Sequence, residues 1–261
     1  MPNRSIPLLL ALLLAAFAGS PVAAQGGVHP TPAGLAQAAP ATLPFSVGER
    51  ATYQVKLGAL SVGSGYIEVR NAETIDGHAT LHAILSISGG VPLARVDDRY
   101  ETWLDQAGLF SRRFKQNVNE VRYHRNRTYD FSPERKTYRR ENGESGPLYT
   151  DKPLDDISFL YFARTLPLAV GDTYRLNRYF KESGNPVVLR VVRRETVKVP
   201  AGTFRTVVVQ PTIQTTGIFG QGGQAEVYFT DDERRIPVMV KTRVPVVGSL
   251  SMYLRTYRAG S

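Results

Sequence analysis

Few side chains in this sequence have the types and spacing that catalysis or metal binding requires. The chain has four histidines and no cysteine. His78 and His82 are four positions apart and can share one face of a strand, whereas His29 and His124 are isolated. Because a zinc site needs three or four convergent ligands, two strand histidines beside a turn do not predict one. We therefore expect no bound metal and no cofactor.

The residues that could support hydrolysis are a serine and two pairs of aspartates. Ser158 follows Asp155-Asp156, and a second pair stands at Asp231-Asp232. There is no Gly-x-Ser-x-Gly motif around the serine, and adjacent aspartates are more commonly turn or helix-cap residues than an acid/base pair. A hydrolase would require His, Asp and Ser side chains to converge in a cleft. We expect that the protein is not an enzyme.

One glycine-rich segment could be mistaken for a phosphate loop. It is Gly220-Gln221-Gly222-Gly223. A phosphate loop continues with Gly-Lys-Ser/Thr and a helix, and this segment has neither. We interpret it as a hairpin tip.

The strongest binding signal is a concentration of positive charge. The formal net charge of the chain is +9, and residues 111–140 contain ten Lys or Arg against three Asp or Glu. In a strand over 120–131, alternate side chains share a face. The four candidate ligand-binding residues on one face are Tyr123, Arg125, Arg127 and Tyr129. Arginines beside tyrosines can pair with phosphorylated or other anionic groups.

The first 24 residues predict export. Arg4 precedes an apolar run, Leu8–Phe17, and Val22-Ala23-Ala24 is typical of a signal-peptide cleavage site. The run is too short for a transmembrane helix, and no later segment is long and apolar enough to be one. We therefore expect a periplasmic protein with no transmembrane span after cleavage. Export and the lack of a nucleic-acid-binding motif argue against nucleic acid as a partner. They favour lipid or another anionic envelope component.

The mature sequence divides into a lead-in and one domain. Residues 25–43 are rich in Pro, Ala, Gly and Gln and carry no charged residue, so we expect a flexible segment there. Residues 44–258 form the predicted single domain. Without cysteines it has no disulfides and must be stabilised by burial, which a chain of this length allows.

Strand patterns dominate that domain. Turn residues such as Asp76-Gly77 and Pro200-Ala201-Gly202 separate short β-branched and aromatic segments. The predicted strands are 49–57, 63–71, 79–88, 94–104, 109–117, 120–131, 135–140, 172–180, 186–198, 203–214, 223–230, 235–244 and 249–257. Short turns between consecutive strands favour antiparallel pairing in sequence order. We predict a mainly β fold in which curved antiparallel sheet forms an open or half barrel.

The strand pattern occurs twice. Val47-Gly48-Glu49 matches Val170-Gly171-Asp172 at an offset of 123, and Glu101 matches Glu226 at an offset of 125. Arg112-Arg113 and Arg234-Arg235 follow the second match. We interpret the two nearly equal offsets as an internal duplication of one β unit.

One helix is predicted between the two copies, near 156–165. The segment Ile157–Arg164 is apolar on every side and lacks turn residues, and Pro167 ends it. Asp155 or Asp156 is placed to cap its N-terminus. Because a short helix that is apolar all round must be buried, we expect it against the concave face of the sheet.

Several of these segments together resemble a known family. They are Phe45-x-Val47-Gly48-Glu49 with Tyr53, Asp156-x-Ser158-x-x-Tyr161-x-x-Arg164, Val170-Gly171-Asp172, Val199-Pro200-Ala201-Gly202-Thr203-Phe204 and Thr230-Asp231-Asp232-x-Arg234-Arg235-x-Pro237-Val238. This combination resembles the bacterial exported family known as domain of unknown function 3108. The resemblance covers roughly residues 45–258 and implies no catalytic residue, because that family has no established activity.

A more distant resemblance concerns the fold. A sheet wrapped around a helix, with strand junctions at Trp103-Leu104-Asp105 and Arg112-Arg113, is similar to the periplasmic lipoprotein-localisation carriers. Those proteins hold acyl chains in an open half-barrel. The resemblance implies that the concave face holds an amphipathic or anionic envelope molecule. The alternative function is a structural or interaction protein of envelope assembly whose core is filled by its own side chains.

Overall fold

The strands form one continuous antiparallel sheet. The computed structural model describes residues 42–91, 94–120, 123–213, 225–244 and 248–261. Within them fourteen strands follow the order β8-β7-β6-β5-β4-β3-β2-β1-β14-β13-β12-β11-β10-β9. The strands are β1 (Arg50–Leu57), β2 (Leu60–Ile75), β3 (His78–Val91), β4 (Ala94–Asp105), β5 (Ser111–Glu120), β6 (Tyr123–Ser132), β7 (Thr137–Arg140), β8 (Ser145–Pro147), β9 (Thr173–Leu176), β10 (Val187–Val199), β11 (Gly202–Thr212), β12 (Ala225–Thr230), β13 (Pro237–Val244) and β14 (Gly248–Arg258).

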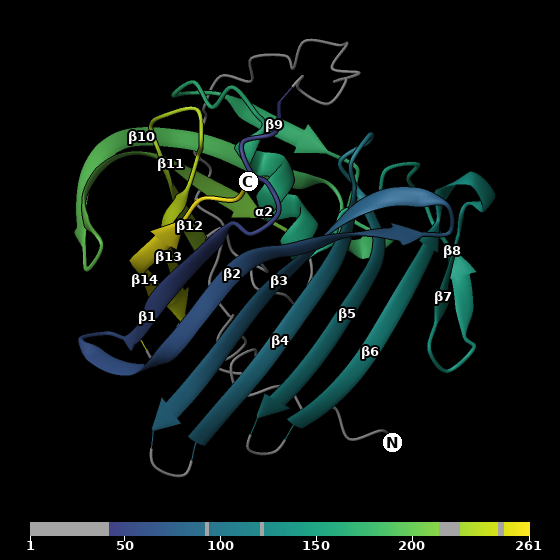
Figure 1. The fold of residues 1–261 in the computed structure, drawn as a ribbon, viewed down its shortest axis with the longest axis horizontal. Coiled ribbons are helices and arrows are strands. Elements are labelled where there is room, and N and C mark those ends of the chain that lie inside the picture. The colour runs from purple at the N-terminus through teal and green to yellow at the C-terminus, as the bar shows by residue number, and fades with distance from the viewer. Residues whose placement is uncertain (1–41, 92–93, 121–122, 214–224, 245–247) are drawn as a thin grey trace, which may run out of the picture.

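The strand order makes the sheet an open half-barrel with two edges. Strands β1 to β8 are neighbours in sequence order, and so are β14 down to β9. The two runs join where β1 pairs with β14 over its whole length. Strands β8 and β9 are therefore the edges of the described sheet. Figure 1 shows the sheet curving around α2 (Asp156–Arg164), which confirms the predicted open half-barrel with one helix.

The internal duplication is visible in equivalent backbone hydrogen bonds. The N–H of Gly48 donates to the Val69 carbonyl at 2.8 Å, and that of Gly171 donates to the Val191 carbonyl at 2.9 Å. Both glycines have positive φ, +86° and +97°, a conformation that other residues rarely adopt. The strand register shifts directly after Val69 and after Val191. The two copies therefore begin with the same turn and the same β-bulge.

A side-chain hydrogen bond also occurs at equivalent positions of the two copies. The hydroxyl of Thr80 donates to the Glu73 carbonyl at 2.8 Å, and that of Thr206 donates to the Glu195 carbonyl at 2.8 Å. Each bond joins the two strands of a hairpin, β2–β3 in the first copy and β10–β11 in the second. Strands β1–β6 thus correspond to β9–β14.

The two arginine pairs of the predicted repeat are not equivalent. The carbonyls of Phe110 and Ile236 accept the bonds that close the corresponding turns, at 2.8 and 2.9 Å. Arg112-Arg113 follows Phe110 and lies on β5, whereas Arg234-Arg235 precedes Ile236 and lies in the turn before β13. This part of the sequence match is wrong: the arginine pairs are offset by 122 positions, whereas the equivalent carbonyls of Phe110 and Ile236 are offset by 126.

Helix α2 is fully buried, as its composition predicts. All nine of its residues are buried. Asp155 is the N-cap: its Oδ1 accepts from the backbone N–H groups of Ile157 and Ser158 at 2.7 and 2.9 Å, and the Ser158 hydroxyl accepts from the Asp155 N–H at 2.8 Å. Asp156 is the first helical residue and not the cap. The helix packs against β3 and β4. Along the chain it lies between β8 and β9, the two edge strands of the sheet.

The core lies between α2 and the concave face of the sheet. Along most strands, alternate side chains point toward the helix, and most of them are apolar. Examples from both halves are Ile67, Leu85, Val227, Val240 and Leu254, each less than 9% exposed. In the described part of the chain, this continuous cluster takes the place of disulfides in holding the domain together.

Some strand boundaries differ from the sequence prediction. The strand predicted over 120–131 is split, because Glu120 is the last residue of β5 and β6 begins at Tyr123. No Gly or Pro marks that hairpin, so composition alone did not show the turn. Strand β9 ends at Leu176, and a 3-10 helix over Glu182–Gly184 follows. Strand β8 and the 3-10 helix Pro133–Arg135 were not predicted.

Candidate functional site

The candidate ligand-binding residues of β6 share the concave face. In the β5–β6 pairing, Arg125 lies opposite Val118 and Arg127 opposite Gln116, and both partners are buried. Tyr129, which has the same strand parity, contacts Phe180 with ring centroids 5.1 Å apart. Since the pairing has no register shift, Tyr123, Arg125, Arg127 and Tyr129 all point to the helix side of the sheet, as the sequence predicts.

Arg125 is supported by an aromatic ring. Its guanidinium lies 4.9 Å from the centroid of the Tyr123 ring. Burial lowers the pKa of Arg125, and the charge of Arg127 lowers it further. In the described part of the chain, neither arginine forms an ion pair with a carboxylate. Within the described residues, neither charge is therefore neutralised by a direct ion pair.

Two further cations join them that the sequence did not indicate. Lys181 follows β9 in the second half of the chain, and its Nζ lies 5.2 Å from the centroid of the Phe180 ring. Burial lowers the pKa of Lys181; Asp156 opposes that shift, and Arg125, Arg127 and Arg140 add to it. The charge of Lys181 therefore interacts with the charges of Arg125, Arg127 and Arg140.

Arg140 completes the group from β7. It lies opposite Tyr129 in the β6–β7 pairing, 6.0 Å from the centroid of that ring. Unlike the other three cations it is already paired, to Glu144 and to Glu141, the latter at 3.7 Å. We define the basic cluster as Arg125, Arg127, Arg140 and Lys181.

Buried carboxyl groups lie near the basic cluster. They include Glu120 of β5, which lies opposite Tyr123 in the β5–β6 pairing. Burial, followed by the charge of Asp155, raises the pKa of Asp156 to about 7, and Tyr179 donates a hydrogen bond to it at 3.3 Å. On β4, burial raises the pKa of Asp98 to about 6. Because burial disfavours the ionised form of both groups, they compensate the cluster incompletely near neutral pH.

A second polar constellation lies at the C-terminal end of α2. Arg164 donates to both carboxylate oxygens of Glu49, at 2.6 and 2.9 Å, and to the carbonyls of Pro44 and Arg234 at 2.8 and 2.9 Å. Burial disfavours the charged guanidinium, but its hydrogen bonds to the Glu49 carboxylate outweigh that effect and the pKa of Arg164 is raised. The Tyr257 hydroxyl also donates to Glu49, at 3.0 Å. Residues far apart in the sequence converge here.

A pocket adjoins this ion pair. It has a volume of about 580 Å³, and Phe45, Glu49, Arg164, Arg235 and Tyr257 contribute to its wall. Its charged groups already have partners within the protein: Glu49 binds Arg164 and Tyr257, and Arg235 pairs with Asp231 at 3.5 Å. We interpret this constellation as structural, because the three arginines in its wall already bind carboxylates within the protein.

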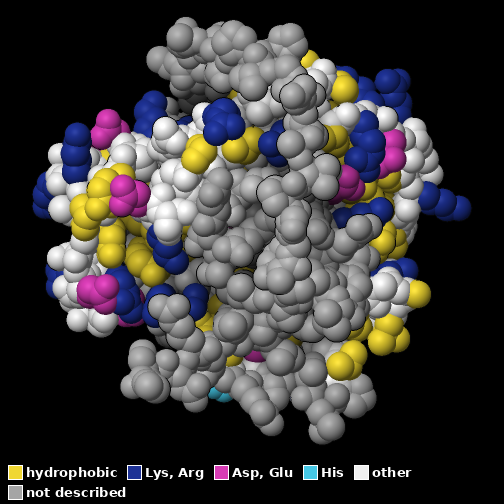
Figure 2. Space-filling model, turned by 180° about the vertical axis from the view of Figure 1, so that it is seen from behind, with side chains coloured by type: hydrophobic (Ala, Val, Ile, Leu, Met, Phe, Trp, Pro, Cys, Tyr) yellow, Lys and Arg dark blue, Asp and Glu magenta, His cyan; other side chains and the backbone are white. Residues whose placement is uncertain are grey.

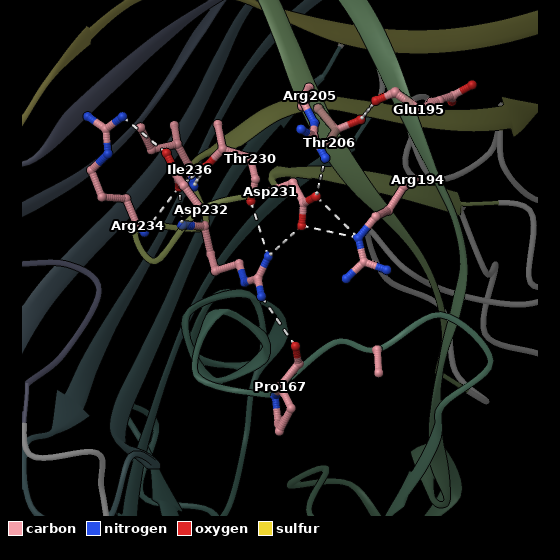
Figure 3. A network of polar contacts seen from close by, with 12 residues as sticks. Pro167, Arg194, Glu195, Arg205, Thr206, Thr230, Asp231, Asp232, Arg234 and Ile236 are labelled. Atoms are coloured by element: carbon pink, nitrogen blue, oxygen red, sulfur yellow. Dashed lines mark hydrogen bonds and ion pairs between the residues drawn. The ribbon is translucent and has the colours of Figure 1, made fainter.

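The aspartates at 231 and 232 organise the turn beside this pocket. Figure 3 shows Arg194 and Arg205 converging on Asp231, at 3.2 and 3.7 Å. Arg235 pairs with the same carboxylate at 3.5 Å. Arg235 also donates to the Pro167 carbonyl at 3.2 Å, just beyond α2. Asp155, at the opposite end of α2, accepts from Thr102 at 2.7 Å. The two aspartate pairs therefore do not form a common acid/base site.

The histidines take part in separate side-chain contacts. His82 stacks on Trp103 with ring centroids 4.3 Å apart and contacts Glu101 at 2.9 Å. His78 contacts Arg112 at 3.2 Å, and His124 is exposed on the outer face of β6. Among the residues described, no group of three or more His, Asp or Glu side chains is arranged to hold a metal ion. His29 and the glycine-rich segment 220–223 lie outside the described residues.

Charged side chains also lie on the outside of the molecule. On the face shown in Figure 2, Lys and Arg side chains are interspersed with Asp and Glu. Exposed arginines form ion pairs, for example Arg193 with Glu226 at 2.7 Å and Arg234 with Asp232 at 3.1 Å. What distinguishes the cations of the inner face is that three of them have no carboxylate partner in the described structure.

A family model matches residues 52–255 and is described as a protein of unknown function, DUF3108. The chain belongs to the DUF3108 family. The match covers β1 through most of β14, so the duplicated sheet and α2 together make up the DUF3108 domain. A comparison with curated proteins gave no match.

The fold of this DUF3108 protein also occurs among solved structures. A β-barrel-like protein of the DUF1849 family from Brucella abortus matches with a TM-score of 0.54 and 11% identity, over 83% of this chain and 99% of that one. A Bacteroides fragilis protein described as a putative exported protein with a YmcC-like fold matches with a TM-score of 0.36 and 14% identity, over 83% and 98% of the two chains. The first match shows a shared fold; the second is too weak to support an argument.

Across the ranges that the structure describes, no helix has the length and apolar character needed to cross a membrane.

Proposed function

We propose that this protein is exported to the periplasm and binds an anionic, amphipathic molecule of the cell envelope on the concave face of its sheet. The head group would contact Tyr123, Arg125, Arg127 and Tyr129. The proposal includes no catalytic step. Export is supported by the N-terminal sequence, in which an apolar segment precedes Val22-Ala23-Ala24.

The observation that carries the proposal is the position of unpaired arginines on an inner face. Arg125 and Arg127 point to the helix side of the sheet, and no ion pair in the described residues neutralises them. A partly buried charge is costly unless it is paired, so a domain stabilised only by packing would not be expected to keep two such charges together. An anionic ligand supplies the missing partner.

The duplication supports an amphipathic ligand. Strand β6 closes the first copy and β14 closes the second. Where β6 presents arginines and tyrosines to the interior, β14 presents Met252 and Leu254, both less than 9% exposed. Equivalent strands thus carry charged side chains on the inner face in one half and packed apolar side chains in the other. A lipid-like molecule has the matching distribution of charge and hydrocarbon.

Native mass spectrometry after periplasmic expression tests the proposal. We expect wild-type protein to carry an additional lipid-sized mass that organic solvent extracts. The double variant Arg125→Gln/Arg127→Gln should lose that mass and bind added anionic lipid at least about tenfold more weakly, since hydrogen bonds to charged groups are each worth about 1.5–3 kcal/mol.

A matched control removes two charges from the same basic segment. Arg135→Gln/Arg139→Gln changes two arginines that are exposed and should leave the bound mass unchanged. A wild-type protein that has a clean apo mass, yields no extractable lipid and binds no added anionic lipid would refute the proposal. That outcome would favour the alternative, a structural or interaction protein with a self-filled core.

A further inference from the structure

Two neighbouring hairpins of the sheet end in exposed apolar residues. Leu60 is 58% exposed and is the first residue of β2, directly after the turn from β1. Val91 is 37% exposed and is the last residue of β3 before the connection to β4. Figure 1 shows the β1–β2 hairpin and the adjoining ends of β3 and β4 at the lower left of the sheet. Both side chains therefore lie at one end of the molecule.

The pairing of β2 with β3 holds these two hairpins side by side. Gly63 lies opposite Gly89, two residues before Val91. A Cβ at Gly63 would lie 2.8 Å from the Cα of Gly89 and 2.3 Å from the Ser88 carbonyl oxygen, closer than real Cβ atoms approach other atoms. Glycine at these positions allows the backbones to pair so closely, and the two hairpin ends extend from one paired unit.

The charged residues of the two hairpin ends are cations. Residues 56–62 contain Lys56, residues 88–95 contain Arg95, and neither segment contains Asp or Glu. Arg95 is exposed and Lys56 is partly exposed. In the described structure, neither of them forms an ion pair with a carboxylate. The next charged residue of β4, Asp97, is two residue pairs further from the end of the hairpin than Arg95.

This combination of side chains fits an anionic membrane surface. A single exposed apolar residue is common on proteins, but here two of them share one end of the sheet with two unpaired cations. Apolar side chains are stabilised at the boundary between head groups and acyl chains, and Lys or Arg near an anionic surface adds electrostatic attraction. We propose that the protein docks on an anionic lipid bilayer through Leu60 and Val91, with Lys56 and Arg95 contacting lipid head groups.

The same end of the sheet contains the candidate head-group residues. Successive antiparallel strands alternate in direction, so the β5–β6 hairpin lies at the same end as the β1–β2 and β3–β4 hairpins. Tyr123 and Arg125 are the first and third residues of β6. Docking would therefore bring this part of the concave face toward the membrane. The inference goes beyond the proposed function, because docking itself requires no ligand on the concave face.

Sedimentation with phospholipid vesicles tests the inference. Purified full-length mature protein is mixed with vesicles that contain equal amounts of dioleoyl phosphatidylglycerol and dioleoyl phosphatidylcholine, or phosphatidylcholine alone. We expect wild-type protein to bind the anionic vesicles at least about tenfold more tightly than the neutral ones, because the two cations gain no electrostatic attraction from a neutral surface. Equal affinity for the two kinds of vesicle would overturn the role of the cations.

Two double variants separate the apolar and the charged contributions. Leu60→Ser/Val91→Ser removes the side chains that enter the membrane interface, so binding to the anionic vesicles should weaken at least about tenfold. Lys56→Gln/Arg95→Gln should weaken that binding by a similar factor and leave the affinity for neutral vesicles unchanged. All four positions lie at the surface, and urea unfolding checks that each variant is folded.

A matched control removes exposed apolar side chains elsewhere. Tyr149 and Val170 are 60% and 48% exposed. They follow β8 and precede β9, at the end of the sheet opposite to the two hairpin ends. Tyr149→Ser/Val170→Ser should therefore bind the anionic vesicles as wild type does. An equal loss in this control would mean that the docking surface is not at the hairpin ends.

Two results would overturn the docking inference outright. They are wild-type protein that does not bind the anionic vesicles, which would point to a protein as the partner of these hairpin ends, and folded Leu60→Ser/Val91→Ser that binds as tightly as wild type. Native mass spectrometry of the same samples keeps the proposed function separate. Bound lipid without vesicle binding would overturn only the docking inference, and vesicle binding without any bound lipid would overturn only the proposed function.

Discussion

At the scale of single residues, the ion pair between Glu49 and Arg164 has the largest expected effect on stability. The two side chains are 6% and 1% exposed and bind through two parallel hydrogen bonds. Arg164 also satisfies the carbonyls of Pro44 and Arg234, which ties the start of the domain and the turn before β13 to the end of α2. Removing either partner leaves a buried charge without compensation.

We predict that Arg164→Met lowers the free energy of unfolding by about 3–5 kcal/mol. Urea unfolding followed by circular dichroism measures the loss. Arg234→Ala is the matched control, because its ion pair with Asp232 is 60% and 40% exposed and should be worth less than about 1 kcal/mol. A loss below about 1 kcal/mol in Arg164→Met would show that the pair does not hold these segments together.

At the scale of elements, α2 begins with two buried carboxyl groups in different situations. Asp155 accepts hydrogen bonds from Thr102 and from two backbone N–H groups of the first turn. Asp156 accepts one longer bond, from Tyr179 at 3.3 Å. Helix capping therefore accounts for Asp155, whereas Asp156 is a poorly solvated acid whose proton affinity is raised by folding.

The pH dependence of stability follows from that difference. Burial raises the pKa of Asp156 from 3.8 to about 7, so the folded protein keeps a proton there that the unfolded chain has lost. This contribution to stability is present below pH 4 and is lost as the pH rises to 7. Asp156→Asn stays neutral, so its stability relative to wild type should rise across that window, by up to about 1.4 kcal/mol per pH unit.

Urea unfolding of wild type and Asp156→Asn at intervals between pH 4 and pH 8 gives the comparison. Taking the difference between the two proteins reduces contributions from groups that they share. The exposed Asp151→Asn serves as control and should differ from wild type by less than about 0.5 kcal/mol at every pH. A stability difference between wild type and Asp156→Asn that is constant with pH would contradict the prediction.

At the scale of the whole molecule, the duplicated sheet makes equivalent positions comparable. Gly48 and Gly171 have φ of +86° and +97° at the same point of the two copies. A Cβ at Gly48 would meet only the Cα of Gly260, at 3.8 Å, and one at Gly171 would meet nothing within 4 Å. Any cost of adding a side chain therefore comes from backbone strain and not from a steric clash.

We predict that Gly48→Ala and Gly171→Ala each lower the free energy of unfolding by about 1–2 kcal/mol, within about 0.5 kcal/mol of each other. Thermal and urea unfolding of both variants provide the values. Gly143 also has a positive φ and open space around it. Gly143→Ala should therefore lower the free energy of unfolding by a similar amount, which measures the cost of backbone strain alone. Unequal losses at Gly48 and Gly171 would mean that the two turns are not energetically equivalent.

The fold could largely be predicted from the sequence because its signals are local. Alternation along each strand, turn residues between strands and an all-apolar segment before Pro167 each depend on neighbouring residues only. They predicted most strands, the buried helix and the duplication. The hairpin after Glu120 was missed because it has no Gly or Pro, and the arginine match was wrong because one pair follows the bond that closes its turn and the other precedes it.

The candidate site, too, was predicted from the sequence only in part. The sequence by itself determined that Tyr123, Arg125, Arg127 and Tyr129 share a face, since alternation fixes this within one strand. Only the tertiary structure decided that Lys181 joins them and that Arg164 pairs with Glu49, 115 positions away. The pairing of β1 with β14 and the packing of the segment after β9 against β6 bring these residues together. Strand order is a property of the whole chain, so no local pattern of residues encodes which distant charges meet.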